Sequence, residues 1–179
     1  PLFPLVLSFL SGTGIEPLRA VSFLNPLLFM GNIFLISYFL RRLPISRRSV
    51  ILALILMTTS KVMLQIHSMA WSEPLFLFTG FLGLLFLVIY LEQPQPAMIW
   101  LILSSVAMAL AFLTRYAGVS LLAASILALI FYGKSKGWKK FQDVILFLLI
   151  SCFPMALWLM RNRILLSHEK YQTTIVGAR

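Results

Sequence analysis

Acidic residues and cysteine are both scarce in this chain of 179 residues. Five Asp and Glu stand against fifteen Lys and Arg, and the single cysteine, Cys152, excludes an intrachain disulfide and a paired-cysteine metal site. A glycine-rich phosphate loop, a Gly-x-Ser-x-Gly elbow and a His-Glu-x-x-His pair are also missing, so the common signatures of soluble enzymes are absent. No segment resembles a nucleic-acid-binding module.

Apolar residues dominate what is present. The chain is 60% hydrophobic and has a mean hydropathy of +0.96, which is typical of membrane proteins and far above the range of soluble domains. Its net charge of +10 is carried mostly by residues between the apolar runs, where charges determine membrane topology. The sequence therefore predicts an integral, multi-pass membrane protein whose partners include membrane lipids and exclude nucleic acid.

Six apolar segments are long enough to cross a bilayer, which takes roughly 17–25 residues. Because backbone polar groups in lipid must pair within the segment, we expect an all-α, polytopic helix bundle. Residues 98–133 are too long for one crossing, and Arg115 followed by Gly118 predicts a tight hairpin that lifts the charge to the membrane surface. The predicted spans are residues 20–40, 49–67, 74–91, 98–114, 117–133 and 142–160.

Two basic loops, 41–48 and 134–140, fall on the same side of the membrane if six spans alternate, and the positive-inside rule makes that side cytoplasmic. Residues 1–10 are too short to span, so we expect a short helix along the outer interface before a turn at Gly12-Thr13-Gly14. A single transmembrane domain over residues 1–179 then comprises an interfacial segment (1–19), the bundle (20–163) and the start of an extracytoplasmic segment (164–179). The chain does not begin with Met, and we expect it to be an internal part of a longer protein.

Glu73 is the acidic residue whose position needs most explanation, because it lies between two apolar segments at the predicted outer face. His67, Arg115 and Arg161 fall on the same face. Arginine matches phosphate with a planar fork of donors, and a carboxylate with an imidazole can bind a divalent cation or handle protons. Together these side chains suit a phosphate-bearing lipid headgroup.

Each candidate also has a purely structural interpretation. Ser72 or Glu73 can cap the next helix with Pro74 in its first turn, and His67 can be a solvated interfacial residue. Arg115 can extend to lipid headgroups from a turn, and Arg161 can anchor the interface. A last pair of polar residues, Asn25 and Asn32, is expected to form hydrogen bonds between helices.

Four motifs follow one another along nearly the whole chain: Pro-Leu-Phe-Pro-Leu at 1–5, His-Ser-Met-Ala-Trp-Ser-Glu-Pro-Leu-Phe at 67–76, Leu-Thr-Arg-Tyr-Ala-Gly at 113–118, and Trp-Leu-Met-Arg-Asn-Arg at 158–163. In order and spacing they resemble the GT-C membrane glycosyltransferases, in the branch of protein O-mannosyltransferases and lipid A aminoarabinose transferases. The resemblance implies transfer of a sugar from a polyprenyl-phosphate donor to a lipid, glycan or protein acceptor. The site would face the outside of a bacterial plasma membrane or the lumen of the endoplasmic reticulum.

The resemblance also implies roles for individual residues. Arg115, Glu73 and Arg161 would bind the donor phosphate, and Glu73 with His67 would hold a divalent cation, Mg or Mn, if one is needed. No catalytic residue is assigned within the chain, because the family's catalytic carboxylate lies upstream of the Pro-Leu motif. The alternatives are a transporter or lipid flippase without chemistry, or a non-catalytic membrane subunit. The collection of charges at span ends favours an interfacial site over the midplane site of a transporter.

Overall fold

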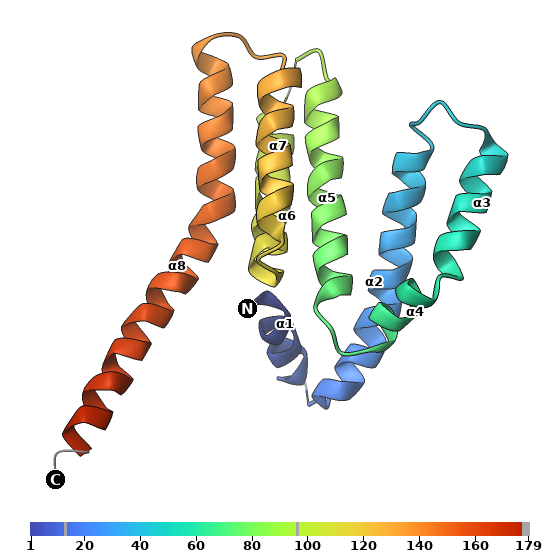
Figure 1. Ribbon diagram of the computed structural model, residues 1–179. Coiled ribbons are helices and arrows are strands. Elements are labelled where there is room, and N and C mark those ends of the chain that lie inside the picture. The colour runs from blue at the N-terminus through green and yellow to red at the C-terminus, as the bar shows by residue number, and fades with distance from the viewer. Residues whose placement is uncertain (13, 96, 177–179) are drawn as a thin grey trace.

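The computed structural model describes the backbone of residues 1–12, 14–95 and 97–176, and the side chains of these ranges as far as residue 165. These residues form eight helices and no strand (Figure 1), so the all-α prediction is confirmed. Thr13 of the predicted turn and residues 177–179 of the predicted tail lie outside the described residues. The helices are α1 (Leu2–Ser11), α2 (Pro17–Leu40), α3 (Arg47–Thr58), α4 (Lys61–Ser68), α5 (Glu73–Glu92), α6 (Met98–Thr114), α7 (Gly118–Tyr132) and α8 (Trp138–Val176).

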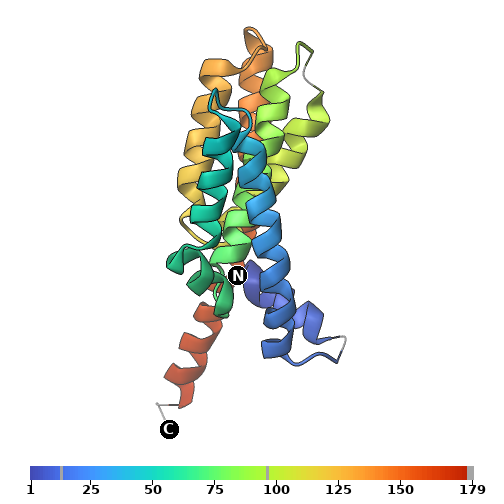
Figure 2. The same ribbon diagram turned by 90° about the vertical axis from the view of Figure 1, so that its right-hand side faces the viewer.

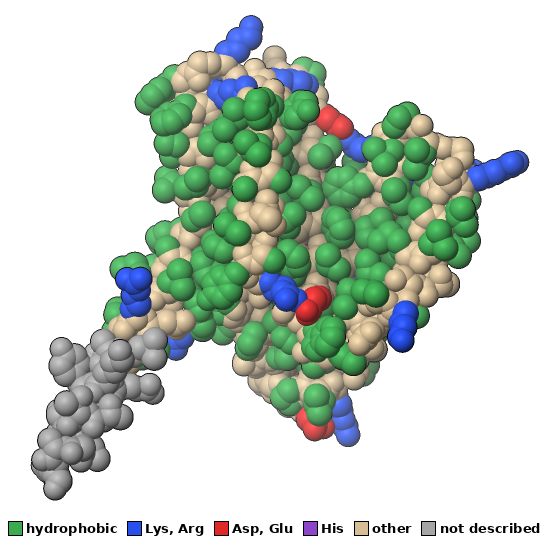
Figure 3. All heavy atoms as spheres, viewed as in Figure 1, with side chains coloured by type: hydrophobic (Ala, Val, Ile, Leu, Met, Phe, Trp, Pro, Cys, Tyr) green, Lys and Arg blue, Asp and Glu red, His purple; other side chains and the backbone are tan. Residues whose placement is uncertain are grey.

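Three helices of the described chain are long and apolar enough to cross a membrane: α2, α5 and α8. A fourth crossing is added if α3 and α4 together count as one bent span. Helices α6 and α7 are equally apolar but have only 17 and 15 residues. Hydrophobic side chains cover most of the face seen in Figure 3, as expected for a bundle in contact with lipid.

The predicted span 49–67 is not one straight helix, and this correction has a local cause. The chain bends by 50° between α3 and α4, at Thr59 and Ser60. The hydroxyl groups of Thr58 and Thr59 donate to carbonyl oxygens of the preceding turn, at 2.9 Å from Leu54 O and 2.8 Å from Ile55 O. Such bonds compete with the backbone ladder and bend helices. Ser60 then adopts an extended conformation, and α4 starts in a new direction.

The predicted hairpin between residues 98 and 133 is confirmed. Helix α6 ends at Thr114, α7 begins at Gly118, and Arg115 between them is extended. Gly118 N–H donates to Arg115 O at 2.9 Å, which closes the turn. A Cβ on Gly118 would lie 2.6 Å from Phe112 Cα, so the close approach of the two helices requires glycine there.

Replacing Gly118 with valine should therefore destabilise the hairpin. Because the obstructing atoms belong to the α6 backbone, the helices must separate, and we expect the free energy of unfolding to fall by about 2 kcal/mol. Reversible unfolding in mixed micelles measures the change. The control is Val119→Ala, at an exposed position of the same turn, which should leave the transition in place. An unchanged transition in Gly118→Val would show that the hairpin does not depend on this contact.

Small residues let the helices of the main core approach closely. Ser104 Oγ on α6 donates to Gly83 O on α5 at 2.8 Å, and Ser151 Oγ on α8 donates to Ser105 O at 3.1 Å. Gly83 packs against Met108, where a Cβ would lie 3.0 Å from the side chain. Small residues and interhelical hydroxyl bonds are how helices associate in membranes, where no hydrophobic force drives them together.

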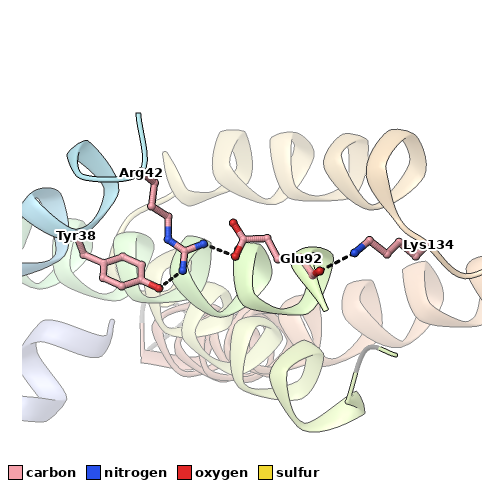
Figure 4. Close-up of polar contacts among 4 residues, drawn as sticks. All are labelled: Tyr38, Arg42, Glu92 and Lys134. Carbon is pink, nitrogen blue, oxygen red and sulfur yellow. Dashed lines mark hydrogen bonds and ion pairs between the residues drawn. The ribbon is translucent and has the colours of Figure 1, made fainter. Parts of the chain in front are cut away.

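Three connections meet at one end of the bundle. Figure 1 shows the α2–α3, α5–α6 and α7–α8 connections at the same end, and Figure 2 shows the same arrangement from the side. There the Arg42 guanidinium donates to Tyr38 and to the Glu92 carboxylate, while Lys134 Nζ donates to Glu92 O (Figure 4). The hydrogen bond that Arg42 donates to the Glu92 carboxylate raises the pKa of Arg42 above its ordinary value. The two basic loops thus lie at the same end of the bundle, as their predicted placement on one side of the membrane requires.

Helix α8 runs beyond its predicted span. It begins at Trp138 and continues to Val176, so residues 164–176 of the predicted extracytoplasmic segment are helical. Pro154 lies inside it and removes one backbone hydrogen bond, which favours a bend. Figure 1 shows the second half of α8 turning away from the other helices.

Candidate functional site

A cavity of about 620 Å³ lies at one end of the bundle (Figure 1). The opposite end holds the α2–α3, α5–α6 and α7–α8 connections, which we call the three-loop junction. We call the cavity the outer cavity, because the predicted topology puts its end of the bundle outside. Three segments that are far apart in the sequence form it: the start of α1, the connection from α4 to α5, and the turn from α6 to α7. Its lining residues are Phe3, Pro4, Ala70, Trp71, Ser72, Glu73, Thr114, Arg115, Tyr116 and Ala117.

Glu73 and Arg115 form an ion pair in this lining, between Arg115 Nη1 and Glu73 Oε1. The two side chains are 30% and 40% exposed, so the pair is accessible from the cavity. A guanidinium has five N–H donors, and this contact uses Nη1. Donors on Nη2 and Nε therefore remain for an anion that enters the cavity.

The structure gives Arg115 a well-defined backbone position. Its N–H donates to Ala111 O at 3.0 Å, which ends α6, and its carbonyl accepts from Gly118 N–H. The neighbouring Thr114 hydroxyl donates to Leu110 O at 2.7 Å and is buried. Arg115 is thus held at the tip of a rigid turn, which suits a residue that must meet a ligand in one geometry.

Glu73 is the first residue of α5. Pro74 lies in the first turn, as the structural interpretation of the sequence predicted, but the side chain of Ser72 makes no capping hydrogen bond. A carboxylate in the first turn is favourable because it faces the positive end of the helix dipole. Glu73 therefore stabilises the start of α5 and also forms the ion pair with Arg115.

Two asparagines of α2 fasten the segment that carries Glu73. Asn25 Nδ2 donates to Met69 O at 2.7 Å, and Asn32 Nδ2 donates to Pro74 O at 3.1 Å. Residues 70–73, between these two anchored carbonyls, are all lining residues of the outer cavity. Both asparagines are almost completely buried, and these two bonds confirm that they form hydrogen bonds across the bundle. The sequence did not indicate that they hold one wall of the cavity.

His67 is buried, with 8% of its surface exposed, so the prediction of a solvated interfacial histidine is wrong. Its Nδ1 lies 2.8 Å from Met63 O, which can only accept, so Nδ1 carries the proton. Nε2 then accepts from Asn32 Nδ2 at 3.2 Å. The Phe29 ring packs edge-on against the imidazole, with 5.0 Å between ring centroids.

The side chains present do not fit a Mg or Mn site. Both ring nitrogens of His67 have other partners, and Glu73 is paired with Arg115. No group of three or more His, Cys, Asp and Glu that could hold a metal ion occurs in the part of the chain that the structure describes. A cation role for Glu73 and His67 stays a prediction without supporting geometry.

Arg161 is not among the residues that line the outer cavity. Its guanidinium lies over the Trp158 ring, 5.3 Å from the ring centroid, and is exposed on α8. This cation–π contact accords with the interpretation of Arg161 as an interfacial anchor. Its role in phosphate binding stays a prediction.

Sequence reasoning did not identify Phe3, Pro4 or Tyr116 as site residues, although all three line the cavity. Phe3 is buried, whereas Tyr116 is exposed at the rim. The only signal for them was membership in two of the four motifs.

No family model matches the chain, and comparisons with curated proteins and with solved structures give no match either. Support for a function of the outer cavity therefore comes from its own chemistry and from the motifs that form it.

Proposed function

We propose that the outer cavity binds the phosphate of a polyprenyl-phosphate-linked sugar and that the protein is a membrane glycosyltransferase. One observation carries the proposal. All the residues that line the cavity belong to three of the four motifs that resemble the GT-C enzymes, at positions 1–5, 67–76 and 113–118. Motifs separated by more than a hundred residues thus contribute to one surface that carries an accessible guanidinium.

In this proposal the chain crosses the membrane six times, through α2, the bent pair α3–α4, α5, α6, α7 and α8. These helices run between the same two ends of the bundle (Figure 1). The positive-inside rule puts the three-loop junction in the cytoplasm and the outer cavity on the extracytoplasmic side. The polyprenyl tail then stays in lipid, and the acceptor approaches from water.

Arg115 is the residue proposed to bind the phosphate. When the sugar leaves the donor, negative charge builds up on the lipid phosphate, and a guanidinium already in place stabilises that charge. The ion pair of Arg115 with Glu73 uses Nη1, so the phosphate would meet the donors on Nη2 and Nε. The proposal assigns no catalytic base to the described residues.

A binding experiment tests the proposal directly. The full chain in nanodiscs is titrated with a polyprenyl phosphate and with the corresponding polyprenol, and Trp71 in the cavity lining serves as the fluorescent reporter. Because only the phosphate can pair with Arg115, we expect it to bind about 100-fold more tightly than the alcohol. The signal should disappear in Trp71→Phe. Equal affinity for both lipids would exclude a phosphate site.

One observation favours a second candidate, a transporter of the same lipid. The bend between α3 and α4 breaks a potential span, and broken helices are common at transporter binding sites. A donor with a radiolabelled sugar distinguishes the two functions. A transferase releases polyprenyl phosphate from its sugar, whereas a transporter moves the intact donor across a liposome membrane.

A further inference from the structure

We propose that a second pocket, between the end of α2 and the start of α3, binds the phosphate of an anionic phospholipid. This α2–α3 pocket has a volume of about 350 Å³. It lies at the three-loop junction, at the end of the bundle opposite the outer cavity, so it is separate from the proposed sugar-donor site. Its lining residues are Arg41, Ile45, Arg47, Val50, Ile51 and Leu54.

The pocket brings two positive charges together without a counterion. Arg41 and Arg47 both line it, no acidic residue does, and within the described residues neither guanidinium has a side-chain partner. Glu92, an acidic residue at this end of the bundle, is already bound by Arg42. Two like charges around one pocket repel each other, and an anion between them removes that repulsion.

The start of α3 adds to the need for an anion. The helix begins with Arg47 and Arg48 and has no acidic residue in its first turn. Cations at this position face the positive end of the helix dipole, which is unfavourable. A phosphate beside Arg47 reverses the sign of that interaction.

The apolar wall of the pocket favours a lipid over a free anion. This wall is formed by Val50, Ile51 and Leu54, which follow Arg47 on α3. This helix lies at the edge of the bundle (Figure 1), and Val50 is its only buried residue. Inorganic phosphate would satisfy the guanidinium groups and leave this wall bare, whereas an acyl chain covers it.

The charge of this end of the bundle fits an anionic lipid. Eight of the fifteen Lys and Arg residues lie in the two basic loops. Basic residues close to an anionic membrane surface are attracted to it. A lipid phosphate between Arg41 and Arg47 would also link the end of α2 to the start of α3. Helix α3 otherwise makes few contacts with the rest of the bundle.

Nanodiscs of phosphatidylcholine with and without phosphatidylglycerol test this inference. Native mass spectrometry counts the phosphatidylglycerol retained by the full chain, and hydrogen exchange follows the amides of residues 47–58. We expect the anionic lipid to slow exchange in α3 about tenfold, and Arg41→Gln/Arg47→Gln to remove both the retained lipid and the protection.

The matched control is Arg48→Gln/Lys136→Gln, which removes the same charge from the same end but leaves the pocket lining intact. It should keep the lipid and the protection. Equal loss in both double variants would show attraction to the whole basic surface and overturn the site. Equal protection by soluble glycerol phosphate would overturn the assignment to a lipid, and full retention in Arg41→Gln/Arg47→Gln would overturn the pocket itself.

Discussion

Replacing Arg115 with glutamine should weaken the binding of polyprenyl phosphate about 100-fold, because it is the only basic residue among the described residues that line the outer cavity. Replacing Glu73 with glutamine should have the opposite sign and strengthen binding several-fold. The carboxylate lies beside the guanidinium, so its removal takes a like charge away from the incoming phosphate. Titration of nanodiscs containing each variant gives both affinities.

The chain offers a matched control for this pair. Glu16 and Arg19 at the start of α2 form an exposed ion pair at 3.6 Å, and neither residue lines the outer cavity. Glu16→Gln and Arg19→Gln change charge by the same amounts and should leave the affinity within about twofold of the wild type. Unchanged binding in Arg115→Gln would contradict the phosphate site. Weaker binding in Glu73→Gln would show that the carboxylate helps to hold the ligand.

Replacing Asn32 with aspartate should lower the free energy of unfolding by about 3 kcal/mol. The side chain is 1% exposed and donates to Pro74 O and His67 Nε2. A carboxylate has the same shape but cannot donate, so Pro74 O loses its partner and a negative charge is buried beside that carbonyl oxygen. Unfolding in mixed micelles gives the change.

The same substitution at Asn162, which is only half-buried on α8, is the control and should leave stability nearly unchanged. A second measurement tests the effect on the cavity wall. With Cys152→Ser and Ser72→Cys as background, Asn32→Asp should speed the reaction of the new thiol with a water-soluble maleimide, because the segment before Pro74 is released. If neither stability nor labelling changes, Asn32 does not hold that wall.

The features that could be predicted from the sequence are those encoded locally. A charge followed by glycine inside a long apolar stretch located the α6–α7 turn at Arg115 and Gly118. The alternation of spans put two basic loops at one end and brought Glu73 and Arg115 to the other. Each conclusion depended on neighbouring residues and on the length of a bilayer crossing.

The features that were missed depend on partners that are distant in the sequence or on competition within a turn. His67 is buried against Asn32, which lies 35 residues earlier and donates a hydrogen bond to its ring. The break at Thr59 arises from hydroxyl bonds that a hydropathy pattern does not record. Arg161 was grouped with Arg115 by topology, but the lining of the outer cavity does not include it.

The shortness of α6 and α7 has a consequence for the surrounding lipid. Helices of 17 and 15 residues are about 25 Å and about 22 Å long, less than the roughly 30 Å of hydrocarbon in a typical bilayer. Such a hydrophobic mismatch is relieved when the bilayer thins around the short elements. Arg115 stands at the tip of these two helices, so in the proposed six-span topology the thinning would form a funnel in the membrane surface that ends at its guanidinium. A lipid headgroup could then descend to the cavity while its tail stays at the depth of its neighbours.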